Sequence, residues 1–152
     1  MLSYEGLFFE ADMVELIHSL ETEKLAIVND EIHCTFKYHP TDEEIFDEIV
    51  GKVFEVYLIG YGNDGQNSGF EILLPDELKD YYINYDEENP NILKVPHITA
   101  SLAEDAKSSN TKNLSFKPLE KPVKLIGRFG YWIKDNEKEY LSYESYSRSK
   151  KI

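Results

Sequence analysis

Two short segments of the chain carry the same pair of chemically active side chains. Ile32-His33-Cys34-Thr35-Phe36 and Pro96-His97-Ile98-Thr99-Ala100 both read His-x-Thr, and both lie in strand-like sequence. Because residues i and i+2 of a β-strand point to the same face, each segment presents an imidazole beside a hydroxyl. The middle residues then point to the opposite face, where apolar side chains suit a core. If the two strands lie near each other, two imidazoles and two hydroxyls converge on one cleft.

Such a set of side chains suits the cleavage of a phosphodiester without a metal. A neutral histidine can take a proton from water or a ribose hydroxyl, and a protonated one can give a proton to the departing oxygen. Imidazole has an unperturbed pKa of about 6.5, so both forms are present near neutral pH. The hydroxyls of Thr35 and Thr99 can donate hydrogen bonds to the non-bridging phosphate oxygens. The sequence leaves open which of His33 and His97 is the acid.

Three further residues are predicted to contact a substrate. Strand alternation places Lys37 on the face of the first motif, where its charge can counter that of a phosphate. Ser101 follows the second motif on the same face, unless the strand ends or bulges there. Tyr61 stands at a strand end before a Gly-Asn-Asp-Gly turn, where it can stack on a base.

The other chemically capable residues favour structural roles. Tyr57 and Trp132 lie in or beside strands, where aromatic side chains more often pack than bind ligands. Arg128 fits a surface position better than a phosphate clamp, and His18 and His39 belong to no paired motif. The histidines and the single cysteine lack a zinc-ligand spacing, and no Gly-rich phosphate loop is present. Neither a metal nor an organic cofactor is expected.

The two motifs resemble the signature of the 2H phosphoesterase superfamily, which has one His-x-Thr/Ser motif in each of two pseudo-symmetric lobes. The run Pro96-His97-Ile98-Thr99 is a frequent form of its second motif. Members include RNA 2′,3′-cyclic phosphodiesterases, 2′,5′-oligoadenylate phosphodiesterases and phage anti-CBASS enzymes that cleave cyclic oligonucleotide signals. The resemblance implies a bilobal α+β fold with antiparallel sheets beside a central cleft. It also implies metal-independent catalysis by His33, Thr35, His97 and Thr99.

Length and charge limit the fold and the partners. The chain has 152 residues, about one domain, and 41% of them are hydrophobic, enough for a sizeable core. Asp and Glu number 29 against 16 Lys and Arg, for a net charge of −13. That balance opposes binding to long duplex nucleic acid or anionic membranes, and it favours a small nucleotide or cyclic oligonucleotide as the substrate. The oligomeric state is left open.

Cysteine usage and hydropathy indicate the compartment. The single cysteine, Cys34, cannot form an internal disulfide, so a reducing, cytoplasmic location is the simplest expectation. The first residues lack the basic segment of a secretory signal, and no apolar run is long enough to span a bilayer.

Periodicity and turn residues predict the elements that position the motifs. Strands are expected over 7–11, 31–38, 52–61, 68–74, 94–102, 123–134 and 139–146. Helices are expected over 12–20, over 41–50 and, as a short segment, over 75–82. Thr41 and Glu44 form a capping-box pattern for the second helix, and Gly51 follows its end. Residues 103–113 read as a polar helical turn or loop, and 147–151 as a frayed basic tail. The prediction is one α+β domain over residues 1–152.

Three functions are compatible with these residues. The first is a metal-independent phosphodiesterase that acts on a small or cyclic nucleotide or on an RNA end. The second is a non-catalytic nucleotide-binding module of the same fold, whose imidazoles and hydroxyls only hold a phosphate. The third is a structural or partner-binding protein in which the paired motif is a coincidence. Turnover that depends on both histidines distinguishes the first from the other two.

Overall fold

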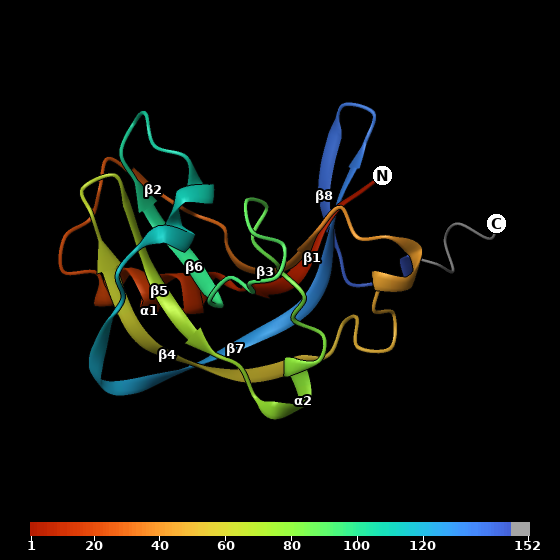
Figure 1. The fold of residues 1–152 in the computed structure, drawn as a ribbon, viewed down its shortest axis with the longest axis horizontal. Helices are drawn as coiled ribbons and strands as arrows, with labels where there is room; N and C mark the ends of the chain where they lie inside the picture. Colours follow the sequence, from red (N-terminus) through yellow and green to blue (C-terminus); the bar gives the residue numbers. More distant parts are fainter. Residues whose placement is uncertain (147–152) are drawn as a thin grey trace.

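A strongly curved antiparallel sheet with a few short helices makes up the protein (Figure 1). The computed structural model describes residues 1–146. In chain order, the elements are β1 (Leu2–Phe9), α1 (Ala11–Leu20), β2 (Ile27–Val28), β3 (Ile32–Tyr38), η1 (Asp42–Glu44), β4 (Val53–Asn63), β5 (Asn67–Leu73), α2 (Asp76–Lys79), β6 (His97–Leu102), η2 (Ser108–Asn113), β7 (Lys117–Asp135) and β8 (Lys138–Ser142). The predicted α+β class is confirmed.

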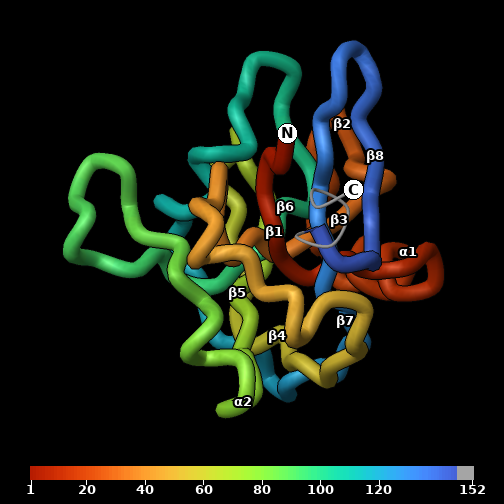
Figure 2. The backbone as a smooth tube through the Cα atoms, turned by 90° about the vertical axis from the view of Figure 1, so that its right-hand side faces the viewer, coloured from red at the N-terminus to blue at the C-terminus, as the bar shows by residue number. Residues whose placement is uncertain are grey.

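The two motif strands lie far apart along the sheet and yet close in space. The hydrogen-bonded order is β2-β6-β5-β4-β7-β1-β3, with β8 paired to β7. β6 and β3 are therefore near opposite ends of this path. The curvature of the sheet brings them together, so that β3 contacts β6 without sharing a ladder with it (Figures 1 and 2).

Both halves of the sheet repeat one local arrangement around the motif. β3 pairs with β1 and β6 pairs with β5, and in each pair a glycine stands opposite the motif threonine. Gly6 is opposite Thr35, and Gly69 is opposite Thr99. A Cβ on Gly6 would lie 2.1 Å from the carbonyl oxygen of the middle residue of its motif, and one on Gly69 would lie 2.4 Å from the corresponding oxygen. Only glycine permits so close an approach of the backbones.

Alanine at either glycine is expected to destabilise the fold by about 1–3 kcal/mol, because the added methyl group meets a backbone oxygen that cannot rotate away. Urea denaturation of Gly6→Ala and Gly69→Ala measures this loss. Gly60→Ala is the control, since its Cβ would first meet the Phe116 side chain at 3.1 Å. Losses no larger than that of Gly60→Ala would contradict the prediction.

An extra residue follows each motif on its strand. On β3, Thr35 and Lys37 pair with two adjacent residues of β1, so one residue of β3 has no partner between them. On β6, Thr99 and Ser101 pair in the same way with two adjacent residues of β5. Such β-bulges change the direction of the side chains that follow. Directly opposed residues share a face, and Ser101 is opposed to the buried Ser68. The bulges therefore turn Lys37 and Ser101 away from the motif side chains.

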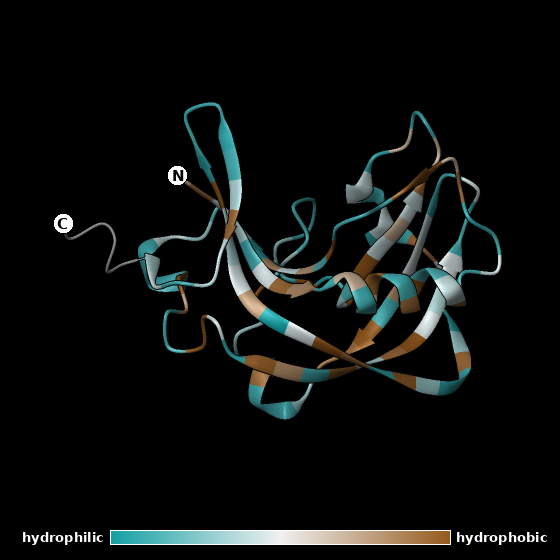
Figure 3. Cartoon of the chain, turned by 180° about the vertical axis from the view of Figure 1, so that it is seen from behind, coloured by the Kyte–Doolittle hydropathy of each residue, from teal (hydrophilic) through white to brown (hydrophobic). Residues whose placement is uncertain are grey.

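Apolar side chains from most strands meet in one core. Buried and more exposed residues alternate along β4, and the ribbon coloured by hydropathy shows hydrophilic and hydrophobic residues interleaved in several strands (Figure 3). The middle residues of both motifs, Cys34 and Ile98, are buried in the core, as the strand pattern predicts. Helix α1 buries Val14 and Ile17 against the same core. Each motif is thus anchored through the face opposite to its imidazole.

The predicted helix over 41–50 is not formed. The backbone N–H of Thr41 does donate to Glu44 Oε1 at 2.9 Å, but only the 3-10 turn η1 follows. Phe46 instead packs edge to face on Tyr81, with ring centroids 4.8 Å apart. This tertiary contact outweighs the local capping signal, while Gly51 still takes the predicted left-handed conformation with φ of 81°.

Other predicted bounds shift by a few residues. β1 begins at Leu2, β6 begins only at His97, β7 extends back to Lys117, and β8 ends at Ser142. The predicted helix 12–20 is confirmed as α1, which begins one residue earlier, at Ala11. The predicted basic tail lies outside the described residues. Within residues 1–146, no helix is both long and apolar enough to cross a membrane.

Candidate functional site

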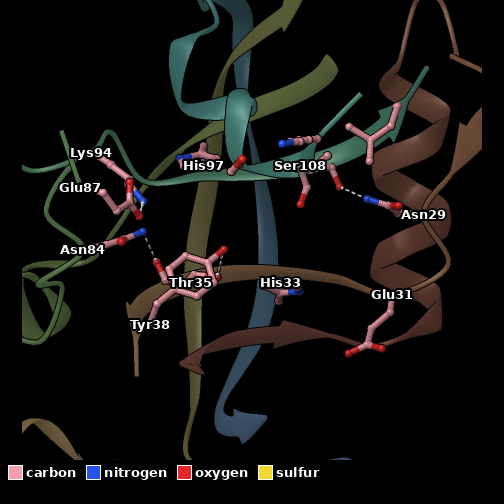
Figure 4. Close-up of a pocket in the computed structure, with 14 residues that line it drawn as sticks. Asn29, Glu31, His33, Thr35, Tyr38, Asn84, Glu87, Lys94, His97 and Ser108 are labelled. Atoms are coloured by element: carbon pink, nitrogen blue, oxygen red, sulfur yellow. Dashed lines mark hydrogen bonds and ion pairs between the residues drawn. The ribbon is translucent and has the colours of Figure 1, made fainter. Parts of the chain in front are cut away.

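A cavity of about 690 Å³ lies between β3 and β6, and both motifs line it (Figure 4). His33, Thr35, His97 and Thr99 all face this space, which falls in the usual size range of small-molecule sites. The convergence that strand alternation predicts for these side chains is therefore present. Loops before β3, before β6 and after β6 supply most of the other lining residues, among them Asn29, Glu31, Asn84, Glu87, Lys94 and Lys107.

His33 is held by aromatic rings. Its imidazole stacks on Tyr4 with ring centroids 4.7 Å apart and lies 5.7 Å from Phe8. Its Nδ1 is buried and has no hydrogen-bond partner among the described residues. Burial, with a smaller contribution from His97, lowers the pKa of His33 to about 4. The imidazole is therefore neutral at pH 7, which is the form that accepts a proton.

His97 is oriented by the backbone. Its Nδ1 lies 2.6 Å from the carbonyl oxygen of Val95. A carbonyl only accepts hydrogen bonds, so Nδ1 carries a hydrogen and Nε2 is the nitrogen left for a substrate. Burial is the main cause that lowers the pKa of His97, and the nearby ammonium groups of Lys94 and Lys112 act in the same direction. The Val95 carbonyl opposes them and supports the protonated ring.

The second motif hydroxyl has a defined partner outside the motif. Thr99 Oγ1 lies 2.7 Å from Thr111 Oγ1 in η2. The amide of the buried Asn67 donates to the same Thr111 oxygen at 3.0 Å. Thr111 can then donate its own hydrogen to Thr99, which leaves the Thr99 hydroxyl hydrogen for the cavity. Thr35 is held more loosely, with its Oγ1 3.5 Å from the Tyr38 hydroxyl.

Two asparagines that line the cavity bind the backbone of the motif threonines (Figure 4). Asn84, from the segment between α2 and β6, donates to the carbonyl oxygen of Thr35 at 3.2 Å. Asn29, from the segment between β2 and β3, donates to the carbonyl oxygen of Thr99 at 2.9 Å. The backbone N–H of Asn29 also donates to the carbonyl oxygen of Ala100, so Asn29 continues the pairing of β2 with β6 and belongs to the same half as Thr99. Asn84 reaches from the β6 half to β3, and its contact helps to fix the separation of the two motifs.

Removal of one asparagine contact is expected to lower the free energy of unfolding by about 1 kcal/mol, because a single hydrogen bond is lost. The effect of Asn84→Ala on turnover is expected to be larger than this loss, at roughly tenfold, because a small displacement of one motif misaligns the other. Urea denaturation and steady-state kinetics measure the two effects. Asn110→Ala, an exposed asparagine of η2, is the control. Turnover as in the control would contradict the prediction.

The three predicted substrate contacts lie elsewhere. Lys37 does not line the cavity, and its Nζ lies 3.8 Å from Glu44 Oε2. Ser101 is fully buried and donates to Glu21 Oε2 at 2.6 Å. The Tyr61 hydroxyl lies 2.9 Å from Ser68 Oγ, also outside the cavity. The β-bulges explain why Lys37 and Ser101 lie outside the cavity. The hydrogen bond to Ser68 explains the position of the Tyr61 side chain.

Lys94, and not Lys37 as predicted, places a positive charge in the lining of the cavity. Its side chain is only 5% exposed, and its ammonium lies 2.5 Å from Glu87 Oε1 and 5.3 Å from the centre of the Tyr38 ring. The Lys94 hydrogen bond is the main cause that lowers the pKa of Glu87 to about 2. Lys94 is outside both motifs, and the sequence pattern gave no signal for it. Asn29, Asn84 and Thr111 were missed for the same reason.

The arrangement provides two imidazoles, two threonine hydroxyls and one nearly buried ammonium around a single cavity. Within residues 1–146, no group of three or more His, Cys, Asp or Glu side chains is placed to bind a metal ion. Compared with known proteins, the chain matches no protein-family model and no curated protein.

Proposed function

We propose that the chain is a metal-independent phosphodiesterase that hydrolyses a small or cyclic (oligo)nucleotide, or an RNA end, in the cytoplasm. The observation that carries the proposal is the convergence of both His-x-Thr motifs on one cavity. Proton transfer needs one neutral and one protonated imidazole within reach of the same phosphate. The repulsion between protonated His33 and His97 favours such a singly protonated pair.

The surroundings of each imidazole support a division of roles. His33, whose burial favours the neutral ring, takes the proton of the attacking water as its oxygen bonds to phosphorus. His97, whose protonated ring is supported by the Val95 carbonyl, gives a proton to the oxygen that leaves phosphorus. The Thr35 and Thr99 hydroxyls donate to the non-bridging oxygens, and Lys94 offsets their charge. Proton exchange with solvent then removes the proton from His33 and restores the proton on His97.

The repeated environment of the two motifs supports a bilobal, 2H phosphoesterase-like organisation. In each half, a glycine opposes the motif threonine, a bulge follows it, and an asparagine side chain binds its carbonyl oxygen. These features lie outside the motifs that suggested the resemblance. They are what two related halves around one cleft would share.

A non-catalytic nucleotide-binding module is the alternative function. The observation that favours it is that the surroundings lower the pKa of both His33 and His97, so that neither ring is mainly protonated at pH 7. Such a pair can accept or donate hydrogen bonds to a phosphate without supplying a proton to a leaving group. Turnover separates the two functions.

Hydrolysis of a substrate panel in EDTA at pH 6 tests the proposal. The panel contains 2′,3′-cyclic nucleotides, linear 2′-5′ and 3′-5′ dinucleotides, and cyclic di- and trinucleotides. We expect EDTA-resistant cleavage of at least one class by the wild type and by His39→Ala, a histidine outside the cavity lining, but not by the His33→Ala/His97→Ala double variant. Absence of cleavage across the panel, or cleavage by the double variant, would overturn the proposal.

A further inference from the structure

A carboxylate and two ammonium groups meet at one end of the cavity. Glu87 and Lys94 both line it, and the Lys94 ammonium lies 2.5 Å from Glu87 Oε1. Lys112, from η2, reaches the other oxygen of the same carboxylate, with its Nζ 3.2 Å from Glu87 Oε2. Figure 4 shows Lys94 and Glu87 together to one side of the two motifs. An anion in the position of this carboxylate therefore contacts both ammonium groups, beside the motif side chains rather than among them.

The two lysines are far more buried than the carboxylate that they hold. The side chains of Lys94 and Lys112 are 5% and 11% exposed, whereas that of Glu87 is 62% exposed. A buried ammonium group needs a partner of opposite charge at all times, because leaving it without one is costly. An exposed carboxylate is well solvated by itself, so it loses little when it leaves an ion pair. The position is thus built for an anion, and Glu87 is a partner that can be exchanged.

The loop that carries Glu87 lets its side chain leave without a change in the sheet. This loop lies between α2 and β6 and projects from the body of the molecule (Figure 2). An isolated bridge between Tyr85 and Leu93 closes it at its base. Lys112 keeps a second partner in the loop, since its Nζ lies 3.1 Å from Asp86 Oδ1. Rotation of the Glu87 side chain into solvent is therefore enough to open the position between the two lysines.

A phosphate suits this position better than a carboxylate does. A terminal phosphate carries up to two negative charges and three acceptor oxygens, and lysine binds phosphate as a compact positive charge. In a nucleotide substrate, the scissile phosphate lies between His33 and His97. An anion at the position of the Glu87 carboxylate is then a different phosphate of the same molecule, and a ligand with a single phosphate cannot fill both places.

We propose that Lys94 and Lys112 form a subsite for a second phosphate of the substrate, and that the Glu87 carboxylate fills this subsite until the substrate displaces it. This proposal rests on the proposed function for the placement of the scissile phosphate. It specifies a substrate with at least two phosphate groups. The Glu87 carboxylate competes with every ligand for the two lysines, so it disfavours anions that bind them more weakly than a phosphate does.

Binding of adenosine 3′,5′-bisphosphate tests the subsite. This compound has two phosphates and no phosphodiester, so it binds without turnover, and AMP is its counterpart with one phosphate. Isothermal titration calorimetry should give a Kd of the wild type several-fold lower for the bisphosphate than for AMP. Glu87→Gln should lower the Kd for the bisphosphate about tenfold further, because a charged competitor for both ammonium groups is removed while the glutamine oxygen still accepts from Lys94. Addition of Lys112→Gln to Glu87→Gln should abolish this gain.

Glu88→Gln is the matched control, because it removes the same charge from the next residue of the loop, which is exposed and outside the cavity lining. Its Kd for the bisphosphate should equal that of the wild type. Equal binding of AMP and the bisphosphate by the wild type would overturn the subsite. So would a gain in Glu87→Gln that is absent, matched by Glu88→Gln, or retained with Lys112→Gln.

Hydrolysis of the substrate panel by the same wild-type preparation keeps the two proposals apart. Turnover without a gain in bisphosphate binding by Glu87→Gln overturns only the subsite. The expected gain without turnover of any substrate overturns only the phosphodiesterase.

Discussion

Replacing either motif histidine by alanine is expected to lower kcat by roughly 10²–10⁴-fold, the usual contribution of a general acid or base. His33→Ala removes the group that takes the proton of water, and His97→Ala removes the group that protonates the leaving oxygen. Because the two act in one step, the double variant should be little slower than either single variant. Steady-state hydrolysis of the best substrate in EDTA measures the three rates.

The pH profile distinguishes these two roles. Because the pKa of His33 is lowered to about 4 and that of His97 is also lowered, the bell-shaped profile of kcat/KM should lie on the acidic side of the usual imidazole value. Below the bell, both rings are protonated and no base remains. Above it, both are neutral and no acid remains. His33→Ala should lose the acidic limb and His97→Ala the alkaline limb.

An optimum above pH 7, or a profile unchanged in either variant, would contradict this assignment. His39→Ala should reproduce the wild-type profile, since His39 lies outside the cavity lining. A uniform loss of rate with unchanged limbs in both motif variants would indicate that they damage the fold rather than the proton transfer.

The second large effect concerns a buried carboxyl group on β1. Glu5 is fully buried, its Oε1 accepts a hydrogen bond from the Phe46 N–H at 3.4 Å, and its Oε2 has no partner among the described residues. Burial is the main cause that raises the pKa of Glu5 to about 8, and Glu44, Asp47 and Glu48 add to it. Glu5→Gln is expected to stabilise the protein above pH 5, because it removes a charge that the native state disfavours.

The size of this gain depends on pH in a defined way. The pKa of Glu5 is raised from 4.5 to about 8 in the native state, so between these values the native state binds more protons than the unfolded state. Native stability therefore falls as the pH rises through this window, and the loss is complete above pH 8. Glu5→Gln should have little effect at pH 4 and should gain roughly 3 kcal/mol at pH 7.

Urea denaturation at pH 4, 6, 7 and 8 measures the gain. Glu55→Gln is the control, because the Glu55 side chain is 60% exposed and 3.9 Å from Lys124. A gain that is the same at every pH, or a loss at pH 8, would contradict the expected titration of Glu5.

The motif residues could be predicted from the sequence because their placement depends on local rules. In a strand, alternation fixes the faces of His33 and Cys34, and the same holds for His97 and Ile98 on β6. Turn and breaker residues such as Pro40 limit where such strands end. These signals are contained in a few neighbouring residues, so no knowledge of the rest of the fold is needed.

The positions of Lys37, Ser101 and Tyr61 could not be predicted in this way. The two bulges depend on the pairing of β3 with β1 and of β6 with β5, and these partner strands are distant in sequence. The Tyr61 side chain is held by its cross-strand neighbour Ser68. The helix expected over 41–50 fails for a similar reason, since Phe46 packs on Tyr81. Pairing partners and tertiary contacts decide such cases, and a single sequence does not reveal them.

The placement of the motifs near opposite ends of the sheet has a consequence for how the protein acquires activity during folding. Hairpins such as β4–β5 join residues close in sequence and can form early, whereas contacts between distant segments form slowly. The cavity between β3 and β6 requires the whole path from one end of the sheet to the other, and the Asn84 contact joins its two sides only when both halves are in place. Recovery of turnover after dilution from urea should therefore coincide with the slowest structural phase, and partly folded chains should be inactive.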